Sequence, residues 1–150
     1  MKQTPEEKKI QDKMAPGILS LQGFLGDDKR NLYEIIREDE KKILQIGKTK
    51  EEIAERMLHF TNQAFESYDG SIIIEEKFEI EYKSVRGRVI CPFPDPGSYQ
   101  KGKINFKNLE NNISLSWSPL NIHMIKAHGF FEGIGSANRL EPEILVKALF

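Results

Sequence analysis

The chain has a single cysteine, no long apolar run and no excess of basic residues. A single cysteine excludes an intrachain disulfide. The apolar runs are only a few residues long, whereas a membrane-spanning helix needs roughly 20. The 22 basic and 23 acidic residues give a formal net charge of −1, whereas a dedicated nucleic-acid binder usually carries a strong basic excess. We therefore expect neither membrane insertion nor nucleic-acid binding.

The composition is that of one globular domain. At 150 residues, with 39% hydrophobic and 30% charged residues, the chain can bury a sizeable core without disulfides or metals. The first residues, MKQTPEEKKIQDK, lack the apolar stretch of a secretory signal, so the cytoplasm is the expected location. We predict a single domain over 1–150, in which residues 1–16 form a frayed or loosely docked arm.

Helical periodicity indicates two helices in the first half of the chain. The first is expected to run from an N-cap at Asp27 or Asp28 to about residue 46. The second begins at a capping box formed by Thr49 and Glu52 and ends near Tyr68. Because the link between them is only about three residues, they are predicted to pack as an antiparallel αα-hairpin.

A period of two replaces the helical period after Gly70. Strands are predicted over 72–82, 85–91, 103–107 and 113–117, with the proline- and glycine-rich stretch 92–102 as a loop. Neighbouring strands of this kind form an antiparallel meander.

Helical signals return near the C-terminus. Ser118-Pro119 resembles an N-cap followed by proline at the first helical position, and Gly129 stands where a helix usually ends. We predict a short helix over 119–128, with a strand continuing from Trp117 as the alternative, and a last helix opening at Glu141-Pro142. The predicted fold class is α+β: an N-terminal αα-hairpin packed on an antiparallel β-meander of about four strands, with short C-terminal helices.

Two of the three histidines, His123 and His128, stand close together in NIHMIKAHGFFEGIGS. A spacing of five residues separates them by about 140° around a helix, whereas helical metal pairs are usually four apart on one face. Either histidine could still join Cys91, with Glu132 as a further ligand, in a set that zinc accepts. The spacing favours structural roles over this metal site.

The same region offers a possible anion site. Gly129, Gly133 and Gly135 precede Arg139 close to the last helix, and a glycine-rich turn before a helix can present backbone N–H groups to an anion. Arg139 could add a bidentate contact, and Arg88 belongs to a modest basic patch on the strands. Neither nucleotide-binding fingerprint is present, and ordinary turn glycines are the alternative.

The predicted function is a small binding domain whose site lies between the segments 91–102 and 123–139. It would take a small anionic ligand or a metal; the candidate ligand-binding residues are Arg88, His123, His128, Glu132 and Arg139. One alternative is an interaction or homodimerisation module without catalysis. Another is an enzyme that uses Cys91 with a histidine. The sequence identifies no cofactor.

Overall fold

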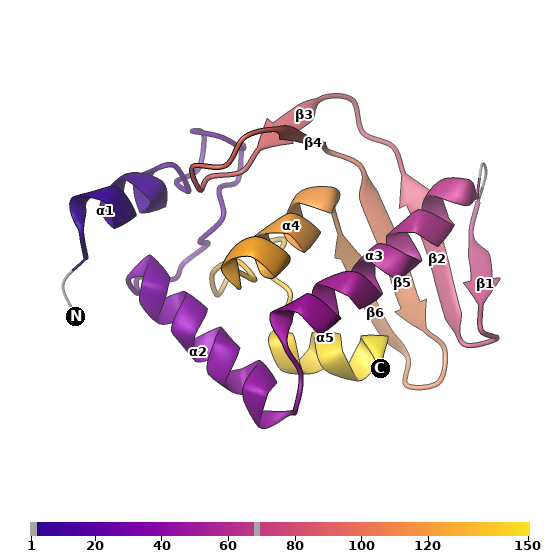
Figure 1. Ribbon diagram of the computed structural model, residues 1–150. Helices are drawn as coiled ribbons and strands as arrows, with labels where there is room; N and C mark the ends of the chain where they lie inside the picture. Colours follow the sequence, from indigo (N-terminus) through magenta and orange to yellow (C-terminus); the bar gives the residue numbers. More distant parts are fainter. Residues whose placement is uncertain (1–2, 68–69) are drawn as a thin grey trace.

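The computed structural model describes residues 3–67 and 70–150 and has an α+β architecture (Figure 1). Strands β1, β2, β5 and β6 form a four-stranded antiparallel sheet in the order β1-β2-β5-β6, and β3 pairs with β4 in a separate two-stranded sheet. The α+β class predicted from the sequence is confirmed. The elements are α1 (Pro5–Asp12), α2 (Leu32–Gln45), α3 (Lys50–Glu66), β1 (Ile72–Ile74), β2 (Phe78–Lys83), β3 (Arg88–Ile90), β4 (Ser98–Gln100), β5 (Lys103–Asn108), β6 (Ile113–Trp117), α4 (Pro119–His128) and α5 (Pro142–Leu149).

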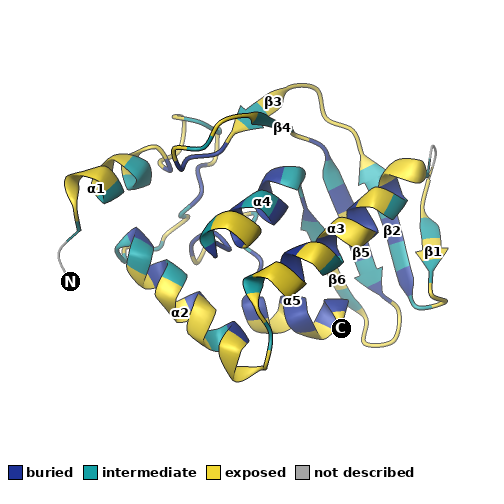
Figure 2. Cartoon of the chain, viewed as in Figure 1, coloured by how far each residue is buried: buried dark blue, intermediate teal, exposed yellow. Residues whose placement is uncertain are grey.

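One face of the four-stranded sheet carries the main hydrophobic core. Side chains alternate between the two faces of a strand, and those of Phe78, Ile80 and Phe106 are buried on the same side. Phe60 of α3 makes edge-to-face contacts with both Phe78 and Phe106. Figure 2 shows the exposed residues of α3 on the side away from this core. The helix therefore covers one face of the sheet.

The sheet differs from the predicted meander at two places. The segment 72–82 is not one strand but two, because Glu75 and Glu76 form a tight turn at positive φ (56° and 57°) between β1 and β2. Such turns usually contain Asn-Gly, so two glutamates give no signal of this turn in the sequence. The predicted strand 85–91 is only three residues long in the structure, as β3. It pairs with β4, which lies within the predicted loop 92–102, and not with the main sheet.

The predicted αα-hairpin is also wrong in its packing. Helices α2 and α3 diverge from their short connection (Figure 1), and their main helix partners are α5 for α2 and α4 for α3. Helical periodicity and capping residues predict where the helices lie in the sequence, but they do not predict which helices pack together. The N-cap of α2 is Asn31 and neither Asp27 nor Asp28, and the predicted end of α3 at Tyr68 lies outside the described residues.

Helix α4 begins and ends where the sequence predicted. The hydroxyl of Ser118 accepts a hydrogen bond from the backbone N–H of Asn121, whose side chain completes a capping box. Gly129 has a left-handed conformation with φ of 64° and closes the helix. Helix α4 carries both histidines of the candidate site. It lies beside α3 and under the β3–β4 hairpin (Figure 1), so both histidines are close to the loop of that hairpin.

Replacing Gly129 by alanine is expected to lower the free energy of unfolding by about 1 kcal/mol, because alanine disfavours positive φ. An added Cβ would meet nothing closer than 3.7 Å, so the cost is conformational and not steric. Urea denaturation of both proteins measures it. Gly129→Asn is the matched control and should lose less, since asparagine tolerates this conformation better. Equal stability of all three proteins would contradict the C-cap assignment.

A second hydrophobic cluster lies away from the sheet and supports the 91–102 loop. It joins Met14, which is fully buried, to Phe93, Met124 and Phe130. The segment predicted as an arm therefore contains helix α1 and a core residue. None of the helices in the described part of the chain has the length and apolar character to cross a membrane.

Candidate metal centre

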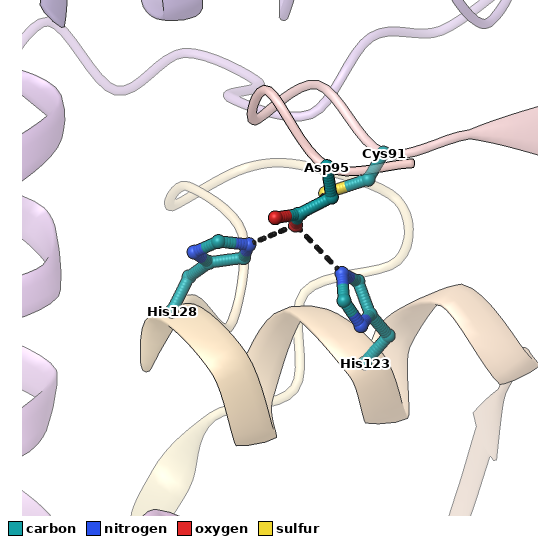
Figure 3. Close-up of side chains that lie close together, drawn as sticks. All are labelled: Cys91, Asp95, His123 and His128. Carbon is teal, nitrogen blue, oxygen red and sulfur yellow. Dashed lines mark hydrogen bonds and ion pairs between the residues drawn. The ribbon is translucent and has the colours of Figure 1, made fainter. Parts of the chain in front are cut away.

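Four side chains converge where the loop after β3 meets α4 (Figure 3). One potential ligand atom from each of Cys91, Asp95, His123 and His128 lies within 4.8 Å of the others. The Oδ2 atom of Asp95 is 2.8 Å from Nε2 of His123 and 2.5 Å from Nε2 of His128. It also accepts a hydrogen bond from Sγ of Cys91 at 3.4 Å. Two nitrogens and a sulfur are thus aimed at a single oxygen.

The two histidines meet despite their five-residue spacing. Their ring centroids are 5.5 Å apart, with the rings nearly perpendicular. Ala127 lies between them on the helix surface, about 40° beyond His123 and 100° before His128, and its methyl group leaves room for both imidazoles. The expectation that this spacing separates the two rings is therefore wrong, because imidazoles extend beyond the backbone cylinder and can bend toward a common partner.

Two aromatic rings fix the planes of the histidines. Phe93 stacks on His128, with centroids 3.9 Å apart and an interplanar angle of 10°. Tyr99 of β4 stacks on His123 at 4.9 Å and 26°. Because both rings are held by neighbours from the same hairpin that supplies Asp95, the Nε2 atoms are oriented before any ligand binds.

The cluster is partly buried. The side chains of His123, His128 and Asp95 are 23%, 18% and 27% exposed, and Cys91 is 4% exposed. Burial, aided by the nearby Asp95 carboxylate, raises the pKa of the Cys91 thiol to about 12. Hydrogen bonds from His128 and then His123 lower the pKa of Asp95 to about 2 against the opposing effect of desolvation. At neutral pH the pair is a thiol beside a carboxylate.

This protonation state is unfavourable for Cys91 as the nucleophile of an enzyme. A cysteine nucleophile needs a lowered pKa that provides thiolate at neutral pH. Here the acidic neighbour stabilises the neutral thiol instead. A cation placed among the four groups would reverse this preference, because a coordinating thiol loses its proton to the metal.

The other predicted ligand-binding residues lie elsewhere. Arg139 is engaged with acidic groups: its guanidinium bonds both oxygens of Asp39 at 2.8 and 2.9 Å and reaches Glu141 at 3.1 Å. Arg88 donates to the hydroxyl and carbonyl oxygens of Ser98. Glu132 is buried, and its carboxylate accepts hydrogen bonds from Asn121 and Ser136. Their roles toward an anion stay predictions, and Cys91, His123 and His128 are the candidates that the structure brings together.

Sequence reasoning missed Asp95. It stands in the stretch CPFPDPG, whose prolines and glycine predict only a loop, and Asp95 and Cys91 are its two ionisable residues. An acidic side chain four residues after the only cysteine, in a segment stiffened by three prolines, was the available signal.

Comparison with protein-family models, with curated proteins and with solved structures gave no match. The cluster of one cysteine, one aspartate and two histidines could hold a metal ion.

Proposed function

We propose that this chain binds one zinc ion through Cys91 Sγ, an Asp95 carboxylate oxygen, and Nε2 of His123 and His128. The observation that carries the proposal is the convergence of these four donor atoms within 4.8 Å of one another. Zinc is usually four-coordinate in proteins and takes sulfur, nitrogen and oxygen ligands together. Alternative ions such as Mg²⁺ and Ca²⁺ prefer oxygen-only sites.

Charge supports a divalent ion. One thiolate and one carboxylate supply two negative charges, and two neutral imidazoles add none, so a Zn²⁺ complex is neutral overall. A neutral centre loses less hydration energy on burial than a charged one. Because Cys91 is a thiol in the metal-free protein, zinc binding must release its proton, and the affinity should rise with pH.

The ligand count favours a structural site. Catalytic zinc usually has three protein ligands and one open position for water, whereas structural zinc has four protein ligands. Here the two ligands of the loop, Cys91 and Asp95, would be joined to the two ligands of α4. The ion would therefore fasten the β3–β4 hairpin to the helix beneath it.

Metal analysis of the purified protein tests the proposal. Elemental analysis and native mass spectrometry are expected to find one zinc per chain, removable by a chelator and restored by adding Zn²⁺. Co²⁺ in the same site should give the visible absorption of tetrahedral cobalt and a thiolate-to-cobalt charge-transfer band, and Cys91→Ser should abolish the latter band.

Single-ligand variants give the matched comparison. We expect at least tenfold weaker zinc binding in each of Cys91→Ser, His123→Gln and His128→Gln. Replacing a residue that only supports a metal ligand already weakens binding by about tenfold or more. His59→Gln should bind zinc as the parent does, because His59 is exposed on α3 outside the cluster. Metal-free protein that takes up no zinc, or equal binding by all variants, would overturn the proposal and leave a hydrogen-bonded cluster.

A further inference from the structure

A cavity lies between the segment 20–24, the region of β3 and the first turns of α4. Its volume is about 330 Å³, within the lower range of small-molecule sites. Apolar side chains from three separate segments line it: Phe24, Val89, Leu120 and Met124. Glu132, Lys101 and Lys103 supply its charged groups. The cavity thus combines an apolar wall with groups of both signs.

Glu132 is the unusual member of this lining. It is 2% exposed, and within the described ranges, 3–67 and 70–150, no basic side chain forms an ion pair with its carboxylate. Buried carboxylates are normally paired with a cation because desolvation of an isolated charge is expensive. Its backbone also has a φ of 72°, a conformation that glutamate rarely adopts. Strained, unpaired groups of this kind gather at functional sites.

The carboxylate of Glu132 is held in place but not saturated. Oε2 accepts a hydrogen bond from Nδ2 of Asn121 and Oε1 accepts one from the hydroxyl of Ser136, each at 2.8 Å. A carboxylate offers about four acceptor positions, so two remain for a ligand. Burial raises the pKa of Glu132 to about 7, against the opposing effects of these two hydrogen bonds and of the positive charge of Lys103. A ligand that brings a positive charge to this carboxylate would form the ion pair that no described basic side chain forms with it.

The two lysines supply the opposite charge. Nζ of Lys103 is oriented by a hydrogen bond to Oδ1 of Asn138 at 2.7 Å, and Lys101 lines the same cavity. With Glu132 ionised, the three charged groups sum to one positive charge. They would therefore repel a simple cation, but they suit a molecule that carries one ammonium and one carboxylate.

We propose that this cavity binds a small apolar zwitterion, an α-amino acid with an aliphatic, thioether or aromatic side chain. Its ammonium group is held by the Glu132 carboxylate, its carboxylate faces Lys101 and Lys103, and its side chain packs on Leu120 and Met124. Amino-acid binding here does not depend on the metal centre, although Met124 follows His123 directly on α4.

Titration of the purified protein with L-leucine, L-methionine and L-phenylalanine, followed by amide chemical shifts and calorimetry, tests the proposal. Two probes each remove one charge: 3-methylbutylamine lacks the carboxylate and 4-methylpentanoate lacks the amine. At least one amino acid is expected to bind at least tenfold more tightly than both probes, with shifts gathered on the cavity residues. Equal binding of 4-methylpentanoate, or no binding of any amino acid at millimolar concentration, would overturn the proposal.

Two variants locate the interaction. Glu132→Gln should weaken amino-acid binding at least tenfold without weakening the binding of 4-methylpentanoate, and Glu143→Gln on the exposed side of α5 should change neither. Unchanged amide chemical shifts of residues outside the cavity show that Glu132→Gln is still folded. Unchanged amino-acid affinity in that folded variant would contradict the role given to Glu132.

Discussion

Adding Zn²⁺ to the metal-free protein is expected to raise its free energy of unfolding by about 4 kcal/mol, when free zinc exceeds the dissociation constant about a thousandfold. The ligands come from two segments, the loop at Cys91 and Asp95 and the helix at His123 and His128. Unfolding separates these segments, so the folded state is expected to bind the ion far more tightly than the unfolded chain does. Urea denaturation in zinc-buffered and chelator-containing solutions measures the difference.

The Asp95→Asn variant provides the control for this prediction. The substitution keeps the size of the side chain but removes one of the two negative charges that neutralise the ion, so most of the zinc-dependent gain should disappear. His59→Gln should retain the whole gain. A similar gain in Asp95→Asn and the parent protein would mean that zinc acts elsewhere on the chain, and the site assignment would fail.

The parts of the fold that the sequence predicted are those determined by hydrogen bonds between residues close in sequence. The boundaries of α4 follow from the Ser118 cap, Pro119 and the left-handed Gly129, and the start of α3 follows from the Thr49–Glu52 capping box. Each of these signals acts within one turn of helix, so neighbouring residues suffice to find it.

The errors concern choices made by distant residues. Whether α2 packs on α3 or on α5 depends on which apolar surfaces meet, and the short connection between α2 and α3 does not decide it. The same holds for β4, whose three residues become a strand only because β3 folds back onto them. Pairing across a proline-rich loop leaves no periodicity long enough to recognise.

The candidate site was predictable only in part. Cys91, His123 and His128 are residue types suited to metal binding, but their spacing in the sequence argues against a common site. Asp95 supplies what the spacing lacks, because its carboxylate lies between the two rings and accepts from both. The contribution of Phe93 and Tyr99, which orient the rings, depends entirely on the folded loop.

Replacing Glu132 by glutamine is expected to remove about 3 kcal/mol of pH-dependent destabilisation. Burial raises the pKa of Glu132 from its ordinary value of 4.5 to about 7 in the folded protein. Between these pH values the folded protein keeps the proton while the unfolded chain loses it. The parent protein should therefore lose stability as the pH rises from below 4.5 to above 7, by about 1.4 kcal/mol for each pH unit of that difference.

The measurement is a pair of urea denaturation series at pH 4 and pH 8, with chelator present so that the metal centre contributes equally to both proteins. The difference in stability between Glu132→Gln and the parent should change by about 3 kcal/mol in favour of the variant at the higher pH. Parallel pH profiles would show that the carboxylate is not desolvated in solution. The expected result would show instead that the chain retains, beside a cavity, a charge that destabilises its folded state, as functional residues often do.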